Sequence, residues 1–116
     1  MNAAVDLFSD ENLSRMKRDL GIAQAVEHAE RVHDGWLDEA YEHLLDYIAV
    51  HDTPFMGEDI RAFATQRGLP APPHLRAWGG VLTRAAKSGA IRKIGFSNVK
   101  DPNGHRGAAT LWERAA

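Results

Sequence analysis

The sequence predicts a mainly helical α+β fold with a small β-hairpin near its C-terminal end. Four segments before residue 90 carry apolar residues at helical spacing, and three of them are followed by a glycine that can end a helix. After residue 90, two short apolar segments flank Asp101-Pro102 and Asn103-Gly104, which are strong turn signals. With 116 residues, 44% of them hydrophobic, the chain is long enough for one compact domain and a small addition.

Residues 10–33 form the first helical segment. Ser9 or Asp10 can cap its start, and Gly35 can end it. Gly21 interrupts the pattern, so the segment is either two helices, 10–20 and 22–33, or one bent helix. Its apolar stripe needs cover from the following domain or from another copy of the chain. The stripe consists of Leu13, Met16, Leu20, Ala23, Val26 and either Ala29 or Glu30.

The next segments predict a helix over 36–51, a short strand over 53–56, and a helix that opens at Gly57 and ends at Gly68. One face of the 36–51 helix is apolar, and the opposite face is acidic. Pro54 makes the 53–56 segment unsuitable as a central strand, and we expect Phe55 to face the core. The apolar face of the 36–51 helix comprises Leu37, Tyr41, Leu44, Leu45 and Ile48.

Residues 69–73 predict a proline-rich turn, after which a helix runs from His74 to about Ser88. One face of this helix is apolar and includes Leu75 and Trp78, whereas the other face is basic. Gly89 stands at the position of a helix-ending glycine. Strands are then predicted over 90–97 and 108–113, joined by a polar, basic loop.

This order of elements, with a basic amphipathic helix that leads directly into a basic strand, is typical of a winged helix-turn-helix domain. In such a domain the basic helix enters the major groove of DNA and the hairpin forms the wing. We therefore assign residues 1–34 to an acidic helical extension and residues 35–116 to the winged-helix domain.

The two halves of the chain carry opposite charge, although the formal net charge is only −2. Residues 1–60 contain four Lys or Arg and fourteen Asp or Glu, giving −10, and residues 61–116 contain ten and two, giving +8. Such an asymmetry favours contact with nucleic acid or with a membrane surface. The alternative is that the acidic half neutralises the basic half within one fold.

The predicted DNA-binding surface combines the basic helix face with the wing. Arginine can bind guanine edges with two hydrogen bonds, lysine and threonine can bind phosphates or bases, and glycine allows close approach. The alternative is a solvated helix face and a loop that is kept polar against edge pairing. The helix contributes Arg76, Gly80, Thr83, Arg84 and Lys87, and the wing contributes Arg92, Lys93, Lys100, His105 and Arg106.

Gly79-Gly80 lies inside the predicted basic helix, where each glycine costs about 1 kcal/mol relative to alanine. Either the pair allows a neighbouring helix to cross closely, which is the interpretation we favour, or one glycine admits the DNA backbone. Trp36, Trp78 and Trp112 are predicted in the core, with indole N–H groups that find partners. Base stacking by one of them is the alternative.

Other classes of function find little support in the sequence. The six histidines lack metal-ligand spacing, no cysteine is present, and no P-loop, GxSxG motif or isolated carboxylate pair occurs. We therefore predict neither an enzyme nor a metal or cofactor site. No run of eighteen apolar residues is present, and the acidic N-terminal residues are unlike a signal peptide, so we expect a cytoplasmic protein without a membrane partner.

The chain resembles winged-helix proteins over most of residues 18–114, and its C-terminal part is similar to small phage and prophage proteins. The segments that carry the resemblance are RDLGIAQAVEHAE (18–30), TPFMGEDIRAFA (53–64), LPAPPHLRAWGGVLTRAAKSGAIRKIGF (69–96) and Trp112. The resemblance implies DNA contact through the 74–88 helix and the 98–107 wing. It implies no catalytic residue, and the acidic extension departs from a minimal winged domain.

We therefore expect a small phage or mobile-element protein, either a transcription regulator or a replication accessory, that binds double-stranded DNA without a cofactor. A single module of this kind binds weakly, so a homodimer or a protein partner bound through the N-terminal helices is part of the hypothesis. One alternative is a winged-helix adaptor that binds proteins and not DNA. Another is that residues 10–34 fold over the basic face as a mimic of DNA.

Overall fold

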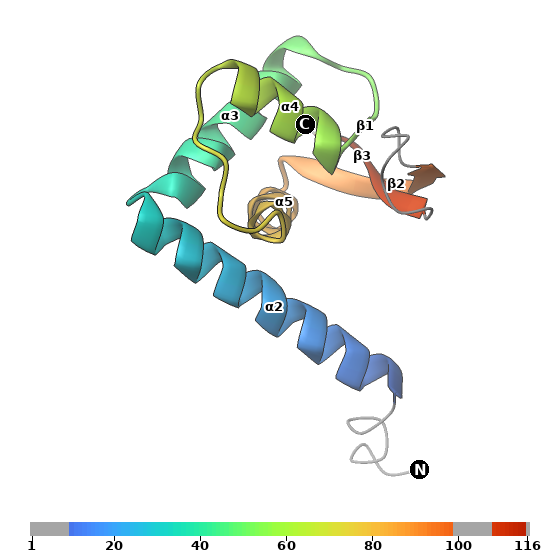
Figure 1. The fold of residues 1–116 in the computed structure, drawn as a ribbon. Coiled ribbons are helices and arrows are strands. Elements are labelled where there is room, and N and C mark those ends of the chain that lie inside the picture. Colours follow the sequence, from blue (N-terminus) through green and yellow to red (C-terminus); the bar gives the residue numbers. More distant parts are fainter. Residues whose placement is uncertain (1–9, 99–107, 116) are drawn as a thin grey trace.

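The computed structural model describes residues 10–98 and 108–115, and this part of the chain contains four helices and a small antiparallel sheet (Figure 1). The predicted α+β class, mainly helical, is therefore confirmed. The elements are α2 (Asp10–Val32), α3 (Trp36–Val50), β1 (Phe55–Met56), α4 (Gly57–Gln66), α5 (Ala77–Lys87), β2 (Ile91–Asn98) and β3 (Ala108–Arg114).

The three strands form one sheet in the order β1-β3-β2, and both pairings are antiparallel. Strand β2 pairs with β3 along its length, apart from a register shift between Lys93 and Gly95. The extra residue, Ile94, makes a β-bulge that reverses the alternation of faces beyond it. Phe96 therefore lies on the same face of the sheet as Ile91 and Lys93. Ile91 is buried on this face, whereas Phe96, further along the strand, is exposed.

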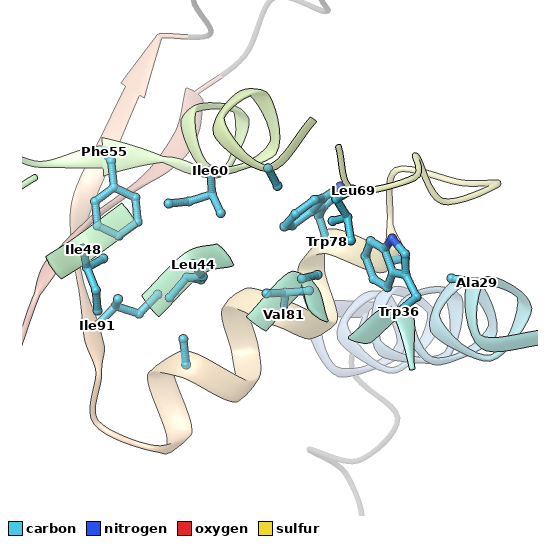
Figure 2. Packing of buried hydrophobic residues seen from close by; sticks show 14 of the residues in the cluster. Ala29, Trp36, Leu44, Ile48, Phe55, Ile60, Leu69, Trp78, Val81 and Ile91 are labelled. Atoms are coloured by element: carbon cyan, nitrogen blue, oxygen red, sulfur yellow. The ribbon is translucent and has the colours of Figure 1, made fainter. Parts of the chain in front are cut away.

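The core lies between α3, α4, α5 and the sheet, with the C-terminal half of α2 added at one end (Figure 2). Phe55 faces this core, as predicted. The α3 helix contributes through the face that the sequence indicated, although its most buried residues are Trp36 and Ala40 as well as Leu44 and Ile48. The largest fully buried side chains are Trp36, Phe55, Leu44, Met56, Ile60 and Val81.

Two of the three tryptophans are buried at the centre of this core. The rings of Trp36 and Trp78 meet edge to face, with centroids 5.3 Å apart and 78° between the planes. The indole Nε1 of Trp36 donates a hydrogen bond to the Pro70 carbonyl at 3.0 Å. The buried Nε1 of Trp78 has no hydrogen-bond partner among the described residues, which differs from the prediction. Trp112 is half-buried and packs against the core from β3.

The α2 helix is continuous over 23 residues, so of the two predicted alternatives the pair of separate helices is wrong. Gly21 lies inside the helix, where a Cβ would meet the Arg76 side chain at 3.3 Å. The first half of the predicted stripe is not covered by the following domain, because Leu13, Met16 and Leu20 are 39%, 61% and 58% exposed. Cover by another copy of the chain stays a prediction. The N-terminal end of α2 extends away from the other elements (Figure 1).

The joint between α2 and α3 is held by one carboxylate. Glu30 accepts hydrogen bonds from the backbone N–H of Gly35 at 2.7 Å and from that of Leu37 at 3.0 Å. These N–H groups belong to the first turn of α3 and to the residue before it, which lack partners within the helix. Gly35 has a φ of 83°, in the left-handed region that glycine tolerates. The sequence therefore turns here through a glycine, and Glu30 caps the next helix.

The α5 helix begins at Ala77 and not at His74 as predicted. Residues 74–76 form a tighter turn, in which the backbone N–H of Ala77 donates to the His74 carbonyl at 3.1 Å. The His74 ring also accepts the Arg76 N–H at 3.1 Å, which favours this turn over an α-helical start. Leu75 is consequently exposed and does not join the apolar face of α5. At the other end, Gly89 stops the helix with a φ of 82°, as predicted.

Candidate nucleic-acid interface

The centre of the predicted DNA-binding face of α5 is covered by α2. A Cβ added at Gly80 would lie 2.6 Å from Cγ2 of Val26, and one added at Gly79 would lie 2.9 Å from Cδ1 of Ile22. Both distances are too short for an ordinary contact, so the absence of side chains is what lets the helices cross. Gly80 is therefore a helix-packing position. The α2 helix occupies the space in which Gly80 was predicted to admit a DNA backbone.

Two further residues of that face are engaged within the protein. Arg84 forms an ion pair with Asp38 of α3 at 2.6 Å, and its guanidinium lies 4.2 Å from the centroid of the Tyr41 ring. The Thr83 hydroxyl donates a hydrogen bond to the Gly79 carbonyl at 2.7 Å, one turn back along α5. Both side chains remain exposed, but their polar groups already have partners.

The remaining predicted residues divide into three groups. Arg92 on β2 is paired with Glu113 on β3. Arg76, Lys87 and Lys93 are exposed cations that form no ion pair within residues 10–98 and 108–115. The three wing residues that complete the prediction, Lys100, His105 and Arg106, lie outside the described residues.

A groove of about 570 Å³ lies between α2 and the β2–β3 pair, with residues of α4 and α5 between them. Three basic residues from three different elements line it, namely Arg18 of α2, Arg61 of α4 and Lys93 of β2. Ile22, Leu82 and Trp112 contribute apolar surface. The sequence brings these residues together because the Gly79-Gly80 pair lets α2 lie close to α5. The three basic residues of this basic groove lie up to 75 positions apart in the chain, from Arg18 to Lys93.

A second, smaller depression of about 430 Å³ adjoins the basic groove and shares Arg18, Ile22 and Gly79 with it. Lys17 and Arg76 add two cations there. Five basic residues therefore line the two connected depressions. The acidic residues of the groove lining are Asp19 and Glu58, and Asp19 lies 3.8 Å from the guanidinium of Arg18 in an exposed ion pair. The balance of formal charge in the lining is positive.

Sequence reasoning found Arg76 and Lys93 but missed Lys17, Arg18 and Arg61. The first two lie in the segment that was assigned to an acidic extension, and Arg61 lies on the helix before the predicted binding helix. The one local signal is that Lys17-Arg18 interrupts an otherwise acidic half of the chain. Nothing local to Arg61 indicates the groove, because its position there depends on how α4 packs.

The acidic residues of α2 do not imitate DNA at this contact. The α2 side chains that pack against α5 are those of Ile22 and Val26. Ala25 and Ala29 of α2 are buried in the core. The contact is therefore apolar packing within one chain. Removing residues 1–34 would expose part of the core as well as the basic helix face.

Neither a metal centre nor a membrane span is found in the part of the chain that the structure describes. No group of three or more His, Asp or Glu side chains there is arranged to hold a metal ion. None of the described helices combines the length and apolar character needed to cross a bilayer. Comparisons with models of protein families, with curated proteins and with solved structures give no match to this chain.

Proposed function

We propose that this chain is a winged helix-turn-helix protein that binds DNA through the basic groove. The element order from α3 to β3 supports the first part of this proposal, because a short strand precedes two helices and a hairpin follows them. In the sheet, the short strand β1 lies beside β3, and β2 begins at Ile91, shortly after α5 ends at Lys87. Residues 35–116 form the winged domain in this proposal, and residues 1–34 form its extension.

The observation that carries the DNA-binding proposal is the convergence of five cations on two connected depressions. Lys17, Arg18, Arg61, Arg76 and Lys93 come from α2, α4, the start of α5 and β2. Phosphate contacts by Lys and Arg supply most of the affinity of proteins for DNA that is independent of sequence. Cations from several elements can contact more than one phosphate of a backbone.

This mode of binding differs from the one expected from the sequence. Because α2 crosses α5 at Gly79-Gly80, the middle of α5 is not available to base edges. In this proposal Lys93 contacts phosphate from the basic groove and Arg76 does so from the adjoining depression, and Lys87 provides an additional cation at the end of α5. The wing residues Lys100, His105 and Arg106 remain predicted backbone contacts.

The biological role that we propose is that of a small cytoplasmic protein of a phage or mobile element. It would act as a transcription regulator or a replication accessory, with no catalytic residue and no cofactor. DNA binding by contacts to the backbone suits either role. The exposed half of α2 leaves room for a second copy or a protein partner.

Fluorescence anisotropy with labelled DNA, at low and at moderate salt, tests the proposal. We expect Arg18→Glu/Arg76→Glu to weaken binding about tenfold or more and to lower the slope of log K against log salt by about 2, because each phosphate contact contributes about 0.9. Arg15→Glu/Arg31→Glu is the matched control, since both arginines are exposed on α2, do not line the basic groove, and give the same change in net charge.

The control variant should bind nearly as well as the wild type. Equal losses in the two variants would mean that net charge, and not the basic groove, governs binding. Absence of binding by the wild type at low salt would overturn the proposal.

A second candidate function is a protein adaptor, and the exposed half of α2 favours it. Leu13, Met16 and Leu20 form an apolar stripe there. Leu20 is about 200° around an ideal helix from Ile22, the α2 residue that packs against α5, so the stripe faces away from α5. Sedimentation of the wild type and of Leu13→Ser/Met16→Ser/Leu20→Ser tests whether this stripe joins two copies. Association that the variant loses would favour the adaptor, whereas a monomeric wild type would exclude self-association through α2.

A further inference from the structure

Phe96 is an exposed aromatic residue at the margin of the basic groove. It is 62% exposed, and the bulge at Ile94 places it on the same face of the sheet as Lys93, whose Nζ lies 4.4 Å from the ring centroid. Across the sheet, Phe96 pairs with Thr110, which lines the basic groove, as Lys93 does. The ring lies outside the hydrophobic core and packs against the Lys93 side chain at the surface.

The arrangement of α2 and α5 disfavours reading of a DNA duplex. The major groove of DNA is about 12 Å wide and admits one helix, which with its side chains is about 10–12 Å in diameter. At the crossing, Val26 and Ile22 lie on the glycines of α5 with no space between the helices. A major groove that received the middle of α5 would also have to receive α2, for which it has no room.

The size of the basic groove suits an unpaired nucleotide. Its volume of about 570 Å³ falls within the range of about 300–1,000 Å³ that encloses a small organic ligand. Proteins that bind single strands combine cations that follow the backbone with aromatic rings on which bases stack. The basic groove has the cations, and Phe96 supplies the ring beside them.

We infer that the basic groove binds single-stranded DNA in preference to a duplex, with one base stacked on Phe96. This inference rests on the proposed DNA binding and specifies the form of the nucleic acid. Arg18, Arg61 and Arg76 bind successive phosphates. The Lys93 side chain moves from the face of the Phe96 ring and contacts the DNA backbone. Because every base has a face that can stack, the site has little preference for sequence.

The test compares a labelled oligothymidylate with a duplex of the same length, by anisotropy at low salt. We expect the single strand to bind more tightly, and Phe96→Ala to weaken its binding about 5- to 100-fold, the range that loss of a base–aromatic stack gives. Phe96→Trp should retain binding. Ile94→Ala is the matched control, because Ile94 is an exposed apolar residue of the same strand and is not paired with a residue of the basic groove. The salt dependence should not change in Phe96→Ala, since no charge is removed.

Three outcomes distinguish the inferred preference for single strands from the proposed DNA binding. Tighter binding of the single strand, lost in Phe96→Ala but kept in Ile94→Ala, supports the inference. Tighter binding of the duplex, or a Phe96→Ala variant that binds the single strand like the wild type, overturns the inference while DNA binding stands. Failure of the wild type to bind either DNA at low salt overturns the proposed function and the inference with it.

Discussion

The two halves of α2, residues 10–20 and 21–32, differ both in their apolar residues and in their surroundings. Residues 21–32 pack into the fold mainly through small residues, and Ala25 and Ala29 are 7% and 1% exposed. Residues 10–20 carry the larger apolar side chains, Leu13, Met16 and Leu20, yet all three are exposed. The difference lies in the partner surface, because the glycines of α5 allow close approach only to the second half. Burial here follows the shape of the neighbour more closely than the hydrophobicity of the stripe.

The largest change in the free energy of unfolding is expected from a charge placed on residues 21–32, compared with the same charge on residues 10–20. Ala29→Glu should lower the free energy of unfolding by about 3–5 kcal/mol, because the carboxylate would be buried without a partner. Leu20→Glu puts a glutamate at an exposed site and should change the free energy of unfolding by less than about 0.5 kcal/mol. Urea unfolding of both variants measures the contrast, and similar losses would mean that residues 10–20 are buried in solution.

A smaller effect is expected where the packed half joins α3. Glu30→Ala removes the acceptor for the N–H groups of Gly35 and Leu37 and should cost about 1–2 kcal/mol, the usual range for loss of a helix cap. Glu27→Ala on the same helix is the control, because Glu27 makes only an exposed pair with Arg31 at 3.9 Å. Thermal unfolding of the two variants compares them, and equal midpoints would show that Glu30 does not cap α3.

The smallest effect concerns the glycines that distinguish the two halves. Gly80→Ala should destabilise the protein by about 1 kcal/mol, because crowding of the stiff Val26 side chain exceeds the gain in helix propensity. Gly79→Ala should be nearly neutral, since its Cβ meets the flexible end of Ile22. In a Val26→Ala background, Gly80→Ala should lose its cost. A Gly80→Ala variant as stable as Gly79→Ala would contradict the close crossing.

Sequence periodicity located most of the elements because their signals are local. The α3 helix, the short strand with Phe55, the end of α5 at Gly89 and both hairpin strands follow from spacing, proline and glycine. The start of α5 was misplaced by three residues, because the hydrogen bond from the Arg76 N–H to the His74 ring favours a tighter turn. The bulge at Ile94 is not visible in the sequence, so the position of Phe96 on the same face as Ile91 and Lys93 was not predicted.

The candidate site was less predictable than the fold. Basic composition named Arg76 and Lys93, which line the two depressions, whereas the ion pair of Arg84 with Asp38 depends on how α3 and α5 pack. The cover of α5 by α2 could be suspected from Gly79-Gly80, which the sequence analysis assigned to packing. That the covering helix would be α2, and that it would bring Arg18 into the basic groove, depends on tertiary structure.

The edge-to-face contact of Trp36 and Trp78 has a spectroscopic consequence. Two indoles with centroids 5.3 Å apart and planes at 78° couple their electronic transitions and give them rotational strength of opposite sign. The far-ultraviolet circular dichroism of this protein therefore contains an aromatic couplet in addition to the helical bands. Trp78→Phe would remove the couplet while leaving the helices intact, which makes the couplet a selective optical signal of core packing.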